Sequence, residues 1–234
     1  GAMLTKVAPR KLTFRPLDER IFCFLRRYIM EKLGKLHLKK KVLDIKETQI
    51  AIKTIKDFFE RRLSKKLNLI RVSAPLFVKP ETGLNDNLSG VEKPVSFNIR
   101  KYNIEVEIVQ SLAKWKRMAL KTYGFNPGEG LYTDMNAIRP DEELDHTHSV
   151  YVDQWDWEKV ITRQDRSEDY LKKTVEDIYE VFKETEEKIN TMYPMLQKKL
   201  PDKIHFITTQ ELEDMYPDKT PKEREHLICE KYKA

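Results

Sequence analysis

The stretch Val150-Tyr151-Val152-Asp153-Gln154-Trp155-Asp156-Trp157 alternates its residue types in the way that a β-strand does. Because successive side chains of a strand point to opposite faces, Val152, Gln154 and Asp156 share one face. A carboxamide and a carboxylate therefore lie on a face that otherwise carries valines. Buried polar groups need hydrogen-bond partners, and a polar ligand can supply those that the protein lacks. The sequence thus predicts a site on this strand.

Two other polar segments precede this strand. They read Gln110-Ser111-Leu112-Ala113-Lys114-Trp115-Lys116-Arg117 and Ile138-Arg139-Pro140-Asp141-Glu142. Arg139-x-Asp141, a loop and a returning strand that ends Gln154-x-Asp156 resemble motif 2 of class II aminoacyl-tRNA synthetases. Gln110-Ser111 followed by Lys116 resembles a signature of aspartyl-tRNA synthetases. The resemblance implies that the three segments belong to one site.

The similarity is closer still to ammonia-dependent asparagine synthetases of the A type, also called aspartate–ammonia ligases. Four segments carry it in the order of that family, at residues 85–90, 111–117, 128–132 and 152–157. The similarity runs from about Lys46 to the end of the chain. It implies an α+β fold in which a class II aminoacyl-tRNA synthetase-like antiparallel sheet is flanked by helices.

The family's chemistry implies the substrates. The side-chain carboxylate of aspartate attacks the α-phosphorus of ATP, which forms β-aspartyl-AMP and releases pyrophosphate, and ammonia then displaces AMP to give asparagine. The resemblance therefore implies aspartate, ammonia and ATP as substrates, with Mg²⁺ accompanying ATP. Because the first step brings anions together, positive charge has to be positioned beforehand.

The resemblance also implies roles for single residues. Arg139 holds the α-phosphate and the substrate carboxylate with the bidentate fork of a guanidinium, and Lys116 neutralises an aspartate carboxylate. Asp141 and Ser149 lie near the nucleotide, although a structural role for these two stays open. The residues expected to bind the polar ends of the substrate are Asp86, Ser111, Gln154 and Asp156.

Charge divides the chain into two parts. Residues 1–46 hold 13 Lys or Arg against 4 Asp or Glu, a net charge of +9. Since the whole chain carries +6, the remaining residues carry −3. Apolar residues recur at helical spacing over residues 16–34. A basic helix can contact nucleic acid, or it can pack on its own domain with a solvated basic face. We expect the packed helix, with residues 1–46 as a basic N-terminal extension and residues 47–234 as the catalytic domain, and nucleic acid is not an expected partner.

The cellular setting follows from what the chain lacks. No apolar run approaches the ~20 residues of a membrane span, and no secretory signal is visible. Cys23 and Cys229 form neither a disulfide framework nor a metal-ligand pattern. The sequence predicts a cytoplasmic protein without a membrane partner.

Local patterns predict most of the remaining elements. Apolar residues spaced for a helix run from residue 47 to 67, and a strand follows at 69–73; these resemble motif 1, which implies a homodimer through residues 47–75. Residues 95–100 and 104–108 alternate as an antiparallel hairpin, and Ser111 can cap the next helix. Further on, we expect a helix over 167–193 and a strand at 204–207. Helices should start at Thr208 and Thr220.

All seven glycines lie at or before Gly130. The glycine-rich motif 3 of class II enzymes, and the family's acidic residues for ATP and magnesium, therefore find no counterpart, and no metal ligand is expected within this chain. The chain resembles a truncated enzyme, incomplete at its C-terminus, whose activity needs a complementary C-terminal segment. Two alternatives remain open: a non-catalytic domain that binds an amino acid or a protein partner, and a nucleic-acid-binding protein that acts through the basic N-terminus.

Overall fold

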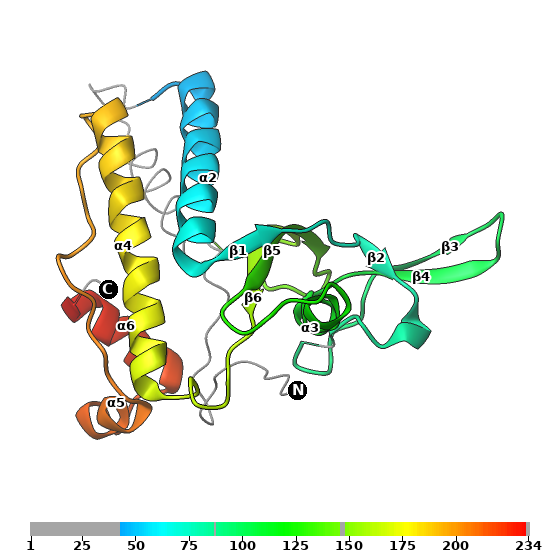
Figure 1. Ribbon diagram of the computed structural model, residues 1–234. Helices are drawn as coiled ribbons and strands as arrows, with labels where there is room; N and C mark the ends of the chain where they lie inside the picture. Colours follow the sequence, from blue (N-terminus) through cyan, green and yellow to red (C-terminus); the bar gives the residue numbers. More distant parts are fainter. Residues whose placement is uncertain (1–42, 87, 146–147, 233–234) are drawn as a thin grey trace. The chain divides into compact units, whose positions relative to one another are not determined.

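The computed structural model describes residues 43–86, 88–145 and 148–232, so the helix predicted over residues 16–34 lies outside the described residues. Helices and two small sheets make up an α+β architecture, as predicted (Figure 1). The described chain divides into two units. The first holds residues 64–167 and both sheets, and the second holds residues up to 63 together with those from 168 onward.

The first sheet of the first unit has the strand order β1-β5-β6. Strand β5 (Gly130–Ile138) pairs antiparallel with β6 (Tyr151–Lys159) over nine residues, whereas β1 (Leu69–Arg71) pairs parallel with β5. The prediction of an antiparallel sheet is therefore confirmed for β5 and β6 and wrong for β1. Parallel neighbours need a long crossover connection, and residues 72–129 provide it.

The alternation predicted for β6 is confirmed. Gln154 lies opposite Met135, and Asp156 lies opposite Thr133, so these four side chains share one face of the sheet. On the other face the rings of Tyr132 and Trp155 stack, with their centroids 4.7 Å apart. One face of β6 is thus polar, and the other is aromatic.

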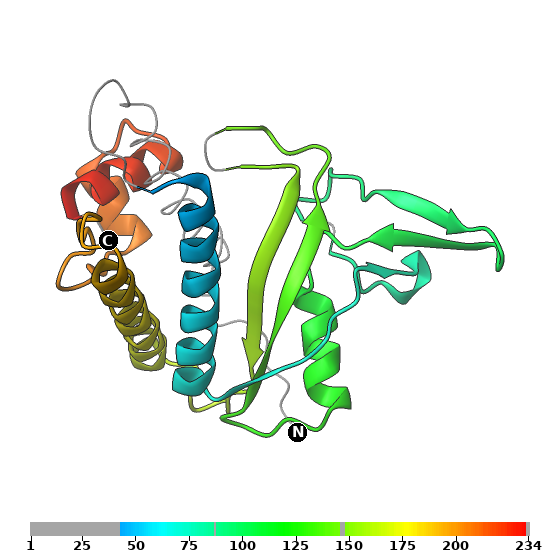
Figure 2. The same ribbon diagram turned by 90° about the horizontal axis from the view of Figure 1, so that it is seen from above.

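Helix α3 (Ala113–Thr122) packs on the polar face (Figure 2). Its apolar side buries Trp115 and Ala119 against the sheet residues Leu131 and Met135. The prediction that Ser111 caps this helix is wrong, because the residue at the cap position is Leu112, which makes no side-chain capping bond. The hydroxyl of Ser111 nevertheless accepts a hydrogen bond from the Ala113 amide at 3.3 Å.

The second sheet has the order β2-β4-β3 and is antiparallel throughout. Strands β3 (Ser96–Ile99) and β4 (Ile104–Ile108) form the predicted hairpin, and β2 (Phe77–Val78) pairs with the far side of β4. A single 3₁₀ turn, η1 (Pro80–Thr82), follows β2.

The second unit is helical. It contains most of α2 (Ile45–Leu67), together with α4 (Glu168–Met192), α5 (Thr209–Met215) and α6 (Pro221–Tyr232). Helices α2 and α4 run side by side in opposite directions (Figure 1), and the rings of Phe59 and Phe182 meet with centroids 5.1 Å apart. The apolar stripe of α2 is therefore core, although Ile50 at its start is exposed. Among the described residues, no helix combines the length and apolarity that crossing a membrane requires.

Caps explain where these helices begin. Thr208 and Glu211 form the predicted capping box of α5, and Thr220 and Glu223 exchange the corresponding bonds at the start of α6. The strand predicted at residues 204–207 is wrong. The segment has no regular secondary structure and pairs with no described strand, and an apolar run without a partner strand cannot satisfy its backbone as a strand does.

Candidate functional site

A lysine held by two carboxylates lies between α3 and β6. The side chain of Lys116 is 3% exposed, and its Nζ donates to Asp156 Oδ1 at 2.5 Å and to the backbone oxygen of Trp157 at 3.0 Å. Glu158 Oε2 lies 3.6 Å from the same nitrogen. A buried ammonium group is costly without partners, and these oxygen atoms supply them. The predicted residues Lys116 and Asp156 are therefore brought together, and Glu158 joins them.

Two glutamines have buried polar atoms that make no hydrogen bond within the part of the chain that the structure describes. Gln154, which shares the face of β6 with Asp156, is 2% exposed, and its Oε1 accepts no hydrogen bond from the described residues. Gln110 is 1% exposed, and neither Oε1 nor Nε2 has a hydrogen-bond partner there. Each unsatisfied buried group costs about 1–3 kcal/mol. Polar atoms left in this state are available to a polar ligand.

Asn85 lies in the loop between η1 and β3 and ties this loop to the segment that leads into α3. This buried side chain accepts from the Gln110 amide at 2.8 Å and donates to the Ile108 carbonyl at 3.2 Å. Its neighbour Asp86, predicted to bind substrate, lies at the beginning of α3. There it accepts from the Lys114 amide at 3.4 Å, and its carboxylate is 3.9 Å from Lys114 Nζ.

Arg139 follows β5 directly, and its backbone amide donates to the Val150 carbonyl at 2.8 Å. Its guanidinium reaches back toward the start of α3, where Nη2 donates to the Gln110 carbonyl at 3.5 Å. Nη1 lies 4.0 Å from a carboxylate oxygen of Glu142. The predicted substrate and phosphate ligand is thus anchored to the same segment that carries Gln110 and Ser111.

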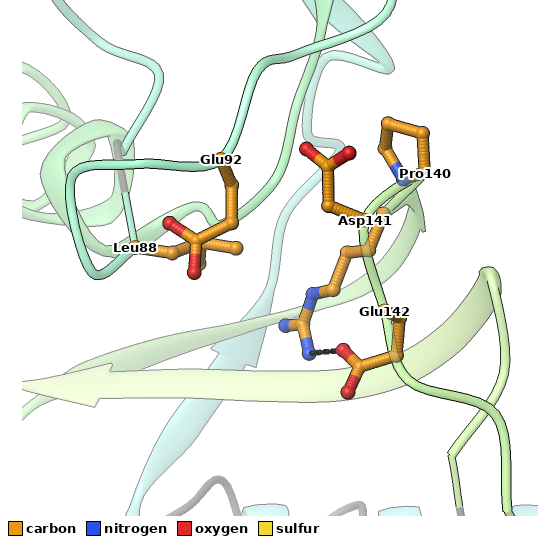
Figure 3. A pocket seen from close by; sticks show the side chains of 6 residues that line it. Leu88, Glu92, Pro140, Asp141 and Glu142 are labelled. Atoms are coloured by element: carbon orange, nitrogen blue, oxygen red, sulfur yellow. Dashed lines mark ion pairs between the residues drawn. The ribbon is translucent and has the colours of Figure 1, made fainter.

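A pocket opens beside Arg139 (Figure 3). Asp141 lies on its wall and accepts a hydrogen bond from the Lys93 amide at 3.2 Å, which joins the two loops that border the pocket. The carboxylate of Glu92 accepts from the hydroxyl and amide of Ser89, and these bonds hold the pKa of Glu92 below its ordinary value. The residues that line the pocket are Leu88, Glu92, Arg139, Pro140, Asp141 and Glu142.

The side chains that line the pocket include one guanidinium and three carboxylates. A guanidinium suits a phosphate oxygen, and carboxylates suit hydroxyl donors or a cation. Ser149, predicted near the nucleotide, is exposed and does not line this pocket. Within residues 43–86, 88–145 and 148–232, no group of three or more His, Cys, Asp or Glu side chains is arranged to hold a metal ion.

Three residues of this region were missing from the sequence-based candidates. Glu158 continues the alternation of Gln154 and Asp156, so the strand pattern alone could have added it. Gln110 lies inside the segment that resembles the aspartyl-tRNA synthetase signature. The side chain of Asn85 forms hydrogen bonds with backbone groups more than 20 residues away, and no local sequence pattern indicates such bonds.

Comparison with known proteins identifies the family of this chain. The family model described as aspartate-ammonia ligase matches residues 46–234. Proteins named aspartate–ammonia ligase are 65% identical in Clostridium tetani, 63% in Ruminiclostridium cellulolyticum and 64% in Fusobacterium nucleatum, each over 82% of this chain. The chain spans 57–58% of the length of these curated relatives. A model that covers most of the chain and identities above 60% place this chain in the aspartate–ammonia ligase family.

Proposed function

We propose that this chain carries the aspartate site of an ATP-dependent aspartate–ammonia ligase. The observation that carries the proposal is the buried cluster of Lys116 and Asp156 next to the unsatisfied carboxamide of Gln154. An amino acid is a zwitterion with a carboxylate at one end and an ammonium group at the other. A desolvated lysine, a carboxylate and a carboxamide within one small site complement these groups.

The proposed roles follow from the chemistry of each group. Lys116 binds a carboxylate of aspartate, and Asp156 accepts from its ammonium group. Gln154 completes the substrate's hydrogen bonds with Oε1, which accepts none from the described residues. Asp86, close to the start of α3, also reaches the substrate's amino group, and Ser111 binds a polar end of the substrate with its hydroxyl.

ATP supplies the leaving group that the aspartate carboxylate lacks, because attack on the α-phosphorus gives β-aspartyl-AMP and releases pyrophosphate. Arg139 stabilises the charge that develops on the α-phosphate and fixes the attacking carboxylate next to it. Asp141 and Ser149 border the nucleotide. Ammonia then forms the new C–N bond and AMP leaves. Mg²⁺ accompanies the triphosphate, and we assign it no ligand in this chain.

We propose that the first sheet is the core of a class II synthetase-like fold. The antiparallel pair β5 and β6, with Arg139 at the turn between them, supports this assignment. We also propose residues 1–46 as an extension to a catalytic domain from residue 47, and a cytoplasmic homodimer joined through residues 47–75. A complementary C-terminal segment supplies the remaining contacts to ATP. The relatives' greater length supports that segment.

A conservative change at Gln154 tests the aspartate site. Gln154→Met replaces the unsatisfied carboxamide by a side chain of similar shape, so it should leave the free energy of unfolding unchanged or raise it by about 1 kcal/mol. Binding of L-aspartate, followed by calorimetry, should weaken roughly tenfold, which corresponds to one lost hydrogen bond of about 1.4 kcal/mol. Gln49→Met, on the exposed side of α2, is the matched control. Equal aspartate affinity in the wild type and Gln154→Met would contradict the proposal.

Turnover is tested separately. The chain is mixed with aspartate, ATP, magnesium and ammonium, and pyrophosphate and asparagine are measured with and without the C-terminal part of a relative. We expect aspartate binding in both cases and synthesis only with the added segment, because a triphosphate misplaced by about 1 Å can already slow the reaction roughly a hundredfold. Turnover at an ordinary ligase rate by the chain alone would refute the need for that segment.

A further inference from the structure

The side chain of Gln110 is almost completely buried and has no role in the site described so far. Gln110 is 1% exposed, and neither its Oε1 nor its Nε2 makes a hydrogen bond with any residue that the structure describes. A primary carboxamide has two N–H donors and an acceptor oxygen, and leaving such groups buried and unsatisfied is unfavourable. This side chain therefore indicates a ligand that offers both an acceptor and a donor.

The main chain of Gln110 is fixed beside residues that we propose to bind substrate. Its amide donates to Oδ1 of Asn85, the neighbour of Asp86, at 2.8 Å. Its carbonyl accepts from Nη2 of Arg139 at 3.5 Å, and Ser111 follows it directly. In the proposed function, Arg139 holds the α-phosphate and the carboxylate that attacks it. The reacting carboxyl group then lies next to Gln110.

We propose that Gln110 binds the nitrogen that becomes the side-chain amide of asparagine. Its Oε1 accepts a hydrogen bond from ammonia, and its Nε2 donates to the acyl oxygen of β-aspartyl-AMP. The inference rests on the proposed aspartate site and adds a residue for the second half of the reaction. A carboxylate in this position would favour the ammonium ion, which has no lone pair for the attack, whereas a neutral carboxamide does not.

A carboxamide provides both contacts that amide formation needs. The lone pair of ammonia attacks the acyl carbon, so a C–N bond forms, and the bond from that carbon to the phosphate oxygen breaks with its electron pair on AMP. The nitrogen loses one proton to the departing phosphate, and Gln110 keeps its own protons. Meanwhile Nε2 stabilises the negative charge that develops on the acyl oxygen. Afterwards the same two atoms of Gln110 face the carbonyl oxygen and the amide nitrogen of the product.

Asparagine and aspartate report on this contact because they differ only at the group that Gln110 would bind. The amide of asparagine offers an acceptor to Nε2 and a donor to Oε1. The ionised side chain of aspartate offers acceptors alone, which leaves Oε1 without a donor. Gln110 therefore contributes one more hydrogen bond to bound asparagine than to bound aspartate.

The first arm of the test compares the two amino acids in calorimetry with the chain. Gln110→Met keeps the shape of the side chain and removes both contacts, so it should weaken L-asparagine about tenfold more than L-aspartate. Gln49→Met, on the exposed side of α2, is the matched control and should leave both dissociation constants unchanged. An equal loss for both ligands, or no loss for either, would overturn the role of Gln110 and leave the aspartate site standing. If the wild type binds neither amino acid, the aspartate site itself fails, and the inference fails with it.

The second arm needs no ligand and separates binding from folding. Since no described residue satisfies the carboxamide, Gln110→Met should leave the urea midpoint of unfolding unchanged or raise it. A fall in the midpoint well beyond that of Gln49→Met would show that the carboxamide serves the fold, and it would overturn the assignment.

Discussion

Replacing Lys116 by methionine tests how the site is held together. Methionine retains most of the side chain's length but removes its charge, so Asp156 and Glu158 remain close together and mostly buried without the cation between them. Removing one partner of a buried ion pair costs about 3–5 kcal/mol, because the charge of the other partner is left uncompensated. We therefore expect Lys116→Met to lower the free energy of unfolding in urea by that amount at neutral pH.

The companion variants separate charge from packing. In a triple variant with Lys116→Met, Asp156→Asn and Glu158→Gln, no uncompensated charge remains, so the loss of stability should be smaller than in Lys116→Met alone. Lys121→Met, an exposed position on the same helix, should change stability by less than about 0.5 kcal/mol. If Lys116→Met costs under about 1 kcal/mol, the value of a surface pair, the cluster is not desolvated and the reasoning fails.

Three further predictions concern the scaffold. Gly130→Ala should lower the urea midpoint by the equivalent of about 1–3 kcal/mol, since the new methyl group would lie 2.5 Å from the backbone oxygen of Glu158; an unchanged midpoint would contradict this. Asn85→Ala should cost about 1–3 kcal/mol in the same assay, because it removes the side-chain partner of the buried Gln110 amide and of the Ile108 carbonyl. Bonds from the Thr208 amide and hydroxyl hold the pKa of Glu211 below its ordinary 4.5, so the ionised box stabilises α5 above that pH and the contribution disappears as the pH falls through the lowered pKa. Circular dichroism should therefore show helix loss on acidification that Glu211→Gln lacks, and identical acid profiles would count against it.

The sequence predicted those elements whose patterns involve residues only two to four positions apart. The alternation in β6 depends only on the two-residue repeat of a strand, and it correctly placed Gln154 and Asp156 on one face. The capping boxes at Thr208 and Thr220 involve residues three positions apart and were equally readable. Residues 204–207 show the limit of this approach, because an apolar run becomes a strand only where a partner strand lies beside it.

The parts that could not be predicted depend on contacts between distant residues. The parallel pairing of β1 with β5 joins Leu69 to Gly130, and nothing near either residue indicates it. The second carboxylate at Lys116 and the bonds of Asn85 are likewise tertiary. For the candidate site, sequence resemblance proposed Lys116, Asp156 and Arg139, while the lack of partners for the Gln110 side chain among the described residues depends on its surroundings.

The parallel pairing of β1 also affects the order in which the first unit folds. The β3–β4 hairpin closes over a turn of four residues, and such hairpins form in about 1–10 μs. Strand β1 must instead wait until residues 72–129 have been arranged, and closing so long a segment has an entropy cost that local contacts do not offset. Lys116 belongs to that segment, and its partners Asp156 and Glu158 belong to β6, which follows β5. During refolding, affinity for the amino acid should consequently emerge late, well after the hairpin has formed.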